Sequence, residues 1–114
     1  MSVKEAIEVQ EGDVIDYTCP GAIDVGDVVP LGTGMIGIAK TSGLLGEVIA
    51  LYIERVFEIN ATTADVIAIG DVVYFDATNR AITTTATSNT RAGRAVSAKA
   101  AATAGTAFVK INAA

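Results

Sequence analysis

The chain has 114 residues, enough for one domain with one core, and 51% hydrophobic against 18% charged residues excludes a disordered segment. It has no histidine and one cysteine, which excludes imidazole catalysis, an internal disulfide and a cysteine-based zinc cluster. The net charge of −5, without clustered Lys or Arg beside aromatic residues, disfavours nucleic-acid binding.

Residues 1–11 are predicted to form an N-terminal arm before a single β domain over residues 12–114. Apolar side chains alternate in the arm with lysine and glutamate. Such a segment can add as a strand to the sheet edge of a partner, with main-chain bonds supplying affinity. The alternative is an ordinary first strand of the same domain, because a sheet also ties down chain termini. The candidate contact residues of the arm are Val3, Lys4, Ala6, Ile7 and Val9.

The amino-acid usage predicts an all-β fold. Valine, isoleucine and threonine supply 13, 12 and 13 residues, against 4 leucines. β-Branched side chains lose rotamer freedom in a helix and pack well on a pleated sheet. Short strands broken by Gly, Asp and Asn favour an antiparallel barrel or sandwich. The expected strands are Ala6–Val9, Val14–Thr18, Val28–Leu31, Ile36–Lys40, Val48–Ile53, Arg55–Ile59, Val72–Asp76, Ala81–Thr84, Arg91–Ser97 and Thr106–Ile111.

A glycine and an aspartate followed by two β-branched residues occur three times, starting at Gly12, Gly26 and Gly70. We interpret these three as turn glycines, because glycine permits the positive φ of a tight turn and the aspartate bonds neighbouring backbone. A longer repeat surrounds the last two copies. Residues 23–29 parallel 67–73, residues 37–39 parallel 93–95, and residues 46–51 parallel 105–110. Two copies are too few for a solenoid, so we predict two related β-units in one domain.

Two polar stretches of the sequence predict loops. The segment Asp76–Arg80 predicts a hairpin turn between Val72–Asp76 and Ala81–Thr84. The Thr, Ser and Asn run from Thr83 to Thr90 is expected to be an exposed loop.

The longest stretch without charge, Val28–Ala39, has 12 residues interrupted by Pro and Gly, which is too short and too broken to span a membrane.

The segment Gly32–Gly37 matches the pattern G-x-G-x-x-G of dinucleotide sites. Such a site needs the pattern to open a helix inside a βαβ unit, and no amphipathic helix follows here. The segment also approaches a P-loop, but Ile38 stands where the phosphate-binding lysine belongs and Lys40 comes two residues late. We therefore interpret it as a glycine-rich β-turn and expect neither nucleotide hydrolysis nor a cofactor.

The remaining reactive residues are interpreted as structural. Cys19 has no histidine or neighbouring cation to activate it, so we expect a small apolar residue at a strand end. The N-terminal acids lack the spacing of a calcium loop and are expected to be solvated. No metal site and no catalytic residues are therefore predicted. Those acids are Glu5, Glu8, Glu11, Asp13 and Asp16.

Charge is distributed unevenly along the chain. All 13 acidic residues lie in residues 1–76 with only three basic ones, for a net of −10, whereas residues 77–114 have five basic and no acidic residues. This pattern favours a dipolar surface, with separate faces for acidic and basic partners. The alternative is that strands of the two regions interleave, so that the charges mix in space.

Several short segments, taken in their order along the chain, together resemble a known family. They are residues 11–16, 25–29, 37–39, 46–47, 56–59, 69–76, 82–85, 88–90 and Gly93. Their order resembles the small phage head proteins of the capsid decoration, or cement, family, from about Gln10 to Ile111. Two departures are Ser88, where a glycine is expected, and Arg94 in a strand expected to be more apolar.

The resemblance implies a β-barrel or β-tulip-like homotrimer that binds the outside of the expanded phage capsid through the major capsid protein. It implies a place on the capsid exterior of the virion, assembly in the host cytoplasm and no enzymatic activity. The arm is then expected to dock the capsid by strand addition. The alternative is a self-assembling head-completion, tail or adaptor β-barrel protein. Rings or tubes formed by the protein alone would favour that alternative.

Overall fold

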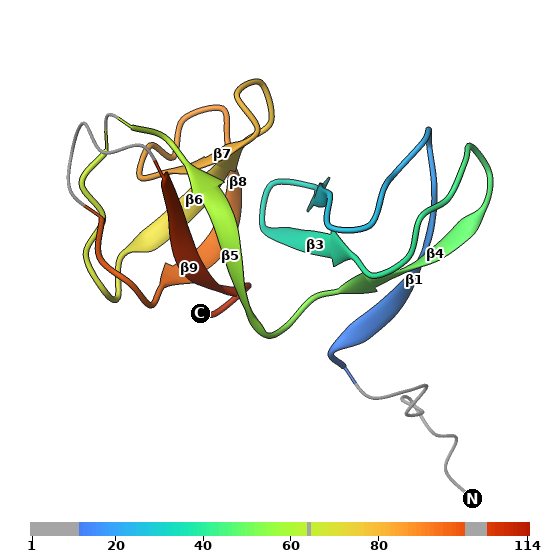
Figure 1. Cartoon of the computed structure of the whole chain (residues 1–114), viewed down its shortest axis with the longest axis horizontal. Coiled ribbons are helices and arrows are strands. Elements are labelled where there is room, and N and C mark those ends of the chain that lie inside the picture. The colour runs from blue at the N-terminus through green and yellow to red at the C-terminus, as the bar shows by residue number, and fades with distance from the viewer. Residues whose placement is uncertain (1–11, 64, 100–104) are drawn as a thin grey trace, which may run out of the picture.

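The computed structural model describes residues 12–63, 65–99 and 105–114, which form nine β-strands and no helix (Figure 1). The expected all-β fold is therefore confirmed. Nine of the expected strands are present, with ends within two residues of the prediction, and the tenth, Ala6–Val9, lies outside the described residues. The strands are β1 Val14–Thr18, β2 Val28–Leu31, β3 Met35–Ala39, β4 Val48–Tyr52, β5 Val56–Ala61, β6 Val72–Asp76, β7 Ala81–Thr83, β8 Thr90–Ala95 and β9 Gly105–Ile111.

The strands form two sheets that follow each other along the chain. The N-terminal half, residues 12–54, is an open antiparallel sheet in the order β1-β4-β3-β2. The C-terminal half, residues 55–114, is a closed barrel in the order β5-β7-β6-β8-β9. The barrel departs from the antiparallel expectation at one place, because Ala61 of β5 pairs in parallel with Ile82 of β7. The two halves lie at opposite ends of the long axis (Figure 1).

The hydrogen bonds of the two halves repeat, as the sequence repeat predicts. In the N-terminal half the Gly26 N–H donates to the Ala39 carbonyl over 2.9 Å, and in the barrel the Gly70 N–H donates to the Ala95 carbonyl over 2.8 Å. An isolated bridge joins Ile23 to Gly43, and a second joins Ile67 to Lys99. The two related β-units are therefore present in the backbone.

The strand register corrects the third segment of the repeat by one residue. Leu51 of β4 lies opposite Ala39 of β3, and Val109 of β9 lies opposite Ala95 of β8. Leu51 therefore corresponds to Val109, whereas the sequence comparison had placed it against Lys110. Both side chains point into a core, which is the feature that the two units share at this position.

The register also relates β1 to β5, which the sequence comparison did not detect. Val14 of β1 lies opposite Tyr52, and Val56 of β5 lies opposite Lys110. Because Tyr52 and Lys110 are equivalent, β1 and β5 are equivalent strands. In this alignment Val14 matches Val56 and Asp16 matches the similar Glu58, but the other residues differ, so the match is too short to stand out in the sequence.

The described part of the N-terminal half has no counterpart of β7, so β1 and β2 remain edge strands. One of the chain's two prolines, Pro30, lies in β2, and the other, Pro20, lies two residues after the end of β1. Thr62, whose N–H donates to the Ile82 carbonyl over 2.9 Å, corresponds to Pro20. Tyr74, which faces Thr83 of β7, corresponds to Pro30 in β2. Proline has no N–H to donate to a neighbouring strand, so both prolines disfavour the pairing of a further strand there.

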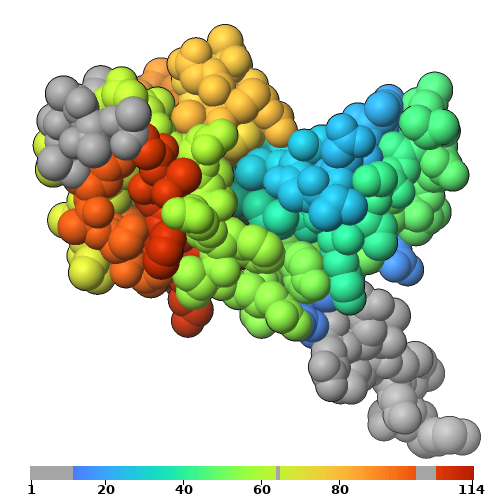
Figure 2. Space-filling model, in the orientation of Figure 1, coloured from blue at the N-terminus to red at the C-terminus, as the bar shows by residue number. Residues whose placement is uncertain are grey.

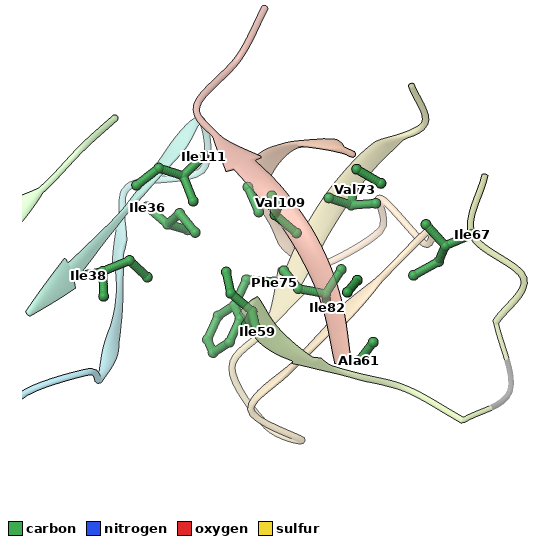
Figure 3. Packing of buried hydrophobic residues seen from close by; sticks show 13 residues of the cluster. Ile36, Ile38, Ile59, Ala61, Ile67, Val73, Phe75, Ile82, Val109 and Ile111 are labelled. Carbon is green, nitrogen blue, oxygen red and sulfur yellow. The ribbon is translucent and has the colours of Figure 1, made fainter. Parts of the chain in front are cut away.

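Two apolar clusters fill the molecule, and β3 contributes to both of them. Ile36 and Ile38 of β3 reach into the cluster built by the barrel strands around Phe75 (Figure 3). Ala39, on the other face of β3, belongs to the cluster of the N-terminal half with Leu51. All four residues after Met35 in β3 are buried, so this strand is the packing joint between the halves.

Asn112 fixes the same joint by hydrogen bonding. Its side-chain oxygen accepts the N–H of Ile36 over 2.9 Å, and its amide nitrogen donates to the carbonyls of Ile36 and Ile53. The side chain thus extends the ladder of β3 beyond the end of β4, and ties β3 to the C-terminal end of the barrel. Asn112 has a positive φ of 60°, a conformation that asparagine tolerates better than most residues.

Candidate functional site

The five arm residues named as contacts lie outside the described residues. Those residues are Val3, Lys4, Ala6, Ile7 and Val9. Of the three turn glycines, Gly12 lies in the turn before β1. Gly26 and Gly70 lie in equivalent turns and have positive φ angles of 88° and 94°. The structure thus places Gly12 before β1, and Gly26 and Gly70 in equivalent turns of the two halves.

The turns around Gly26 and Gly70 share a bond that fixes their shape. The Asp27 carboxylate accepts the N–H of Asp24 over 2.9 Å, and the Asp71 carboxylate accepts the N–H of Ala68 over 2.9 Å. The sequence comparison missed a third turn of the same kind. In it the Glu47 carboxylate accepts the N–H of Leu44 over 2.6 Å, and Gly46 has a φ of 83°.

Each of these three turns exposes an aliphatic side chain just before its glycine. Val25, Leu45 and Ile69 are 63%, 74% and 70% exposed. Single exposed aliphatic side chains are common on protein surfaces, and it is contiguous apolar patches that mark surfaces meeting another molecule. The pattern Gly-Asp or Gly-Glu after an aliphatic residue is the sequence signal that could have found them.

Exposed apolar side chains gather on two surfaces, one on each half. We call the first the N-terminal tip; its residues are Leu44, Leu45, Glu47 and Val48. It lies at the end of the molecule far from the barrel (Figure 2). We call the second the β9 face; its residues are Val56, Glu58, Arg94, Val96, Phe108 and Lys110.

A cleft of about 590 Å³ separates the two halves (Figure 2). One wall is β5, which pairs with β7 at Ala61 and has no strand partner on that side from Val56 to Asn60. Aromatic rings line the cleft, and Tyr52 and Phe57 lie 5.5 Å apart between ring centroids. The cleft is therefore a joint between the halves that apolar and charged side chains line together.

The cations beside the cleft already have partners. The Arg80 guanidinium donates to the carbonyl of Val28 over 2.8 Å, and it lies 4.9 Å from the ring centroid of Phe75. The Arg55 guanidinium lies 4.9 Å from the ring of Tyr52 and forms an ion pair of 3.0 Å with Asp13. These contacts join residues of the two halves, so the cations hold the halves together.

A polar cluster closes the barrel where β5 and β7 meet, and the sequence analysis did not find it. Asp65 accepts hydrogen bonds from the hydroxyls of Thr83 and Thr62 and from the Thr84 N–H. The Thr83 hydroxyl, above all, lowers the pKa of the Asp65 carboxyl, with help from Thr62, Thr84 and the charge of Lys99 against the opposing effect of burial. The cluster therefore has a structural role, because it joins the residues that follow β5 to the end of β7.

Lys99 belongs to the same polar cluster. Its ammonium donates to the carbonyl of Asp65 over 2.9 Å and to the carbonyl of Thr63 over 3.3 Å, and the residue is buried. Thr83 is buried as well, which corrects the expectation that the exposed loop begins there. The exposed run is residues 84–88.

The predicted hairpin between β6 and β7 is present, with Asp76 opposite Ala81. Asp76 organises its turn, accepting the N–H groups of Thr78 and Asn79 over 2.9 and 3.2 Å. The Asn79 backbone bond, above all, lowers the pKa of the Asp76 carboxyl. This carboxylate therefore serves the turn.

The glycine-rich segment and the cysteine, which the sequence analysis weighed as a nucleotide site and a nucleophile, have structural roles. Gly32 and Gly34 form the hairpin between β2 and β3, and Gly32 has a φ of 68°. Cys19 is a buried free thiol at the end of β1, and an added Cβ at Gly43 would lie 3.0 Å from its sulfur. Among the described residues no three Cys, Asp or Glu side chains gather as metal ligands. The described residues also contain no helix long and apolar enough to cross a membrane.

Comparison with known proteins gives one match. A family model described as phage cement protein matches residues 9–111, which is nearly the whole chain. No curated protein and no solved structure matches the chain.

Proposed function

Because the chain belongs to the phage cement protein family, we propose that it decorates the expanded capsid of a phage and stabilises it by binding the outer surface. The family is one of structural proteins that associate with the capsid. The observation that carries the proposal is the family match over residues 9–111.

The mechanism is stabilisation by linkage. A protein that binds the expanded shell but not the unexpanded shell shifts the equilibrium toward expansion by the free energy of that binding. In our proposal the protein binds as a homotrimer that bridges subunits of the major capsid protein, after synthesis in the host cytoplasm. Three arms on one trimer add avidity, because the first contact raises the effective concentration of the others.

The direct experiment is to mix the purified protein with expanded and with unexpanded shells that lack it. We expect co-sedimentation with expanded shells only, added density on their outer face in electron micrographs, and a higher temperature of shell disruption. Equal binding to both forms would contradict the linkage mechanism. Rings or tubes formed by the protein alone would favour the head-completion or tail alternative.

Deletion of residues 1–11 tests the proposed docking by strand addition. We expect the shortened protein to keep its β-rich circular dichroism spectrum and to lose binding to expanded shells at least tenfold. In the full chain, Ile7→Pro should act like the deletion, because proline removes a main-chain donor, and Ile7→Val should bind normally. Normal decoration by the shortened protein would refute the role of the arm.

A further inference from the structure

The edge of β5 that borders the cleft offers main-chain groups without a strand partner. The Ile111 N–H donates to the Arg55 carbonyl over 3.1 Å, so the bonds of Arg55 and of every second residue after it point to β9. The N–H and carbonyl of Val56 and Glu58 therefore point the other way, to the side of the cleft. β7 meets this side of β5 only at Ala61, and nothing else in the part of the chain that the structure describes pairs with Val56 or Glu58 there. Such an edge can take up an added strand.

The opposite wall of the cleft is an apolar row that crosses the N-terminal sheet. Val28 of β2 lies opposite Ile38 of β3, which lies opposite Tyr52 of β4. Tyr52 in turn lies opposite Val14 of β1. Residues opposite each other on neighbouring strands share one face of a sheet, and the first three of these side chains line the cleft. The row thus runs from β2 to β1 and ends at Val14, at the start of the described chain.

The arm, residues 1–11, joins the described chain at one end of this cleft. Asp13 forms an ion pair of 3.0 Å with Arg55, the residue just before β5. Arg55 lies 4.9 Å from the ring centroid of Tyr52, and the Tyr52 ring lies 5.5 Å from the ring of Phe57 in the cleft wall. The arm is therefore attached beside the first residues of β5. An arm that enters the cleft from this end runs antiparallel to β5.

The arm has the length and the pattern of a strand for this site. Its 11 residues reach about 36 Å when extended, whereas the open edge of β5 from Val56 to Asn60 spans about 17 Å. Side chains two residues apart share one face of an extended strand. Val3, Ile7 and Val9 therefore share one face, which fits the apolar row.

Charge in the cleft is balanced, because Lys40 and Arg80 line it together with Asp27 and Glu58. Main-chain bonds and apolar contact, and not net charge, therefore decide what fits. Glu5 is the one acid between the apolar residues on that face of the arm. In the antiparallel direction it comes toward Arg80, which directly precedes β7 at the far end of the open edge.

We propose that the arm of the free protein lies in its own cleft and adds to β5 as an antiparallel strand, with Ile7 and Val9 on the apolar row. The docked arm covers an open sheet edge and its apolar neighbours, which otherwise invite pairing with other chains. Because arm and cleft belong to one chain, a high effective concentration favours the contact. The contact does not rest on the proposed function; under that function the arm leaves the cleft when it pairs with the shell.

Amide hydrogen exchange followed by NMR tests the contact, in the full chain and in the chain without residues 1–11. The Glu58 N–H points to the cleft and should exchange at least tenfold more slowly in the full chain. The Ile59 N–H points to β9 and is the matched control in the same strand, with equal exchange in both proteins. Equal exchange of Glu58 in the two proteins would overturn the proposal. Protection by the arm at Asp16 instead would place the arm on the edge of β1 and would also overturn it.

Two single variants of the full chain place the same charge on opposite faces of the arm. Ile7→Glu puts a carboxylate against the apolar row, so Glu58 should exchange as fast as in the shortened protein. Ala6→Glu, on the other face of the arm, should keep the protection of the wild type. Two variants that both keep the protection, or both lose it, would contradict the assigned face and the proposal with it.

A mixture separates the chain's own arm from the arm of a second copy. Labelled shortened protein is refolded together with an excess of unlabelled full chain, and we expect no protection of Glu58 in the labelled protein. Restored protection would assign the cleft to the arm of another copy and overturn the proposal. Shell binding is measured separately. A full chain that protects Glu58 and ignores expanded shells would refute the proposed function and leave the arm in the cleft.

Discussion

Gly93 occupies a backbone position that requires glycine. It has a φ of 140° and lies beside the bulge where β8 slips against β6, between Val73 and Tyr74. A Cβ there would collide with the carbonyl oxygen of Lys110 and lie 2.7 Å from the Asn112 nitrogen. Backbone atoms of a closed barrel cannot yield as a flexible side chain can, so the space for a methyl group is not available.

We therefore expect Gly93→Ala to lower the free energy of unfolding by at least about 2 kcal/mol, from backbone strain and overpacking together. Denaturation in urea measures the change. Gly34→Ala is the control, because no atom lies within 4 Å of the added Cβ, and it should change stability by about 0.5 kcal/mol or less. Equal stability of the two variants would refute the assignment.

Asp65 makes the barrel sensitive to pH. Hydrogen bonds from Thr83, Thr62 and Thr84 lower the pKa of its carboxyl from the ordinary 3.8. A carboxyl with a lowered folded pKa adds stability above its unfolded pKa, and that stability is lost as the pH falls through the folded pKa. The window for this loss is thus below about pH 4.

Asp65→Asn should lower the unfolding free energy by about 1–2 kcal/mol at pH 7, because the charged acceptor of these bonds is lost. The gap between the wild type and the variant should narrow as the pH falls below 4. Thermal unfolding from pH 7 to pH 2.5 follows both proteins. A constant gap across this range would contradict the role of the charge.

The sequence predicts some residue roles and not others. The turn roles of Gly26 and Gly70 follow from local chemistry, since glycine and the following aspartate act within four residues. Asn112 and Lys99 bond backbone groups 34 to 76 residues away. Nothing in their neighbourhood marks these partners, so only the folded chain reveals them.

The strands themselves are predictable, because apolar alternation and flanking glycine or aspartate set them locally. The closure of the barrel is not. It depends on β7, three residues long, meeting β5 through the single pair Ala61 and Ile82. The sequence repeat suggests two similar units, but it cannot show that an added strand closes one of them while the described part of the other stays open.

The prolines at the open edges have a testable role. Pro30→Thr places an N–H on the edge of β2, where the equivalent Tyr74 of β6 meets β7. We expect this variant to form larger particles than the wild type on heating or at high concentration, as seen by light scattering. Pro20→Thr at the other edge should act in the same direction. Variants that scatter like the wild type would show that proline does not protect these edges.

At the scale of the molecule, β3 couples the halves. Ile36 is fully buried in the barrel cluster, although its strand belongs to the N-terminal sheet. A strand that fills both cores cannot leave one without disturbing the other. The molecule should therefore unfold as one cooperative unit.

Ile36→Ala should then destabilise both halves by about 3 kcal/mol, through the cavity that it leaves. Hydrogen exchange of the slowest amides in β4 and in β9 measures each half separately. The protection of both should fall together. Loss of protection in β9 alone, or two separate unfolding transitions, would show that the halves are independent.

The position of Cys19 gives the protein a reporter of its own. It is the one thiol of the chain and is buried in the N-terminal half. An alkylating reagent reaches such a sulfur only during transient openings, so the labelling rate records how often this half breathes. Comparing that rate for the protein alone and for the protein mixed with expanded shells would measure how far binding to a shell suppresses these openings, with no dye or tag attached.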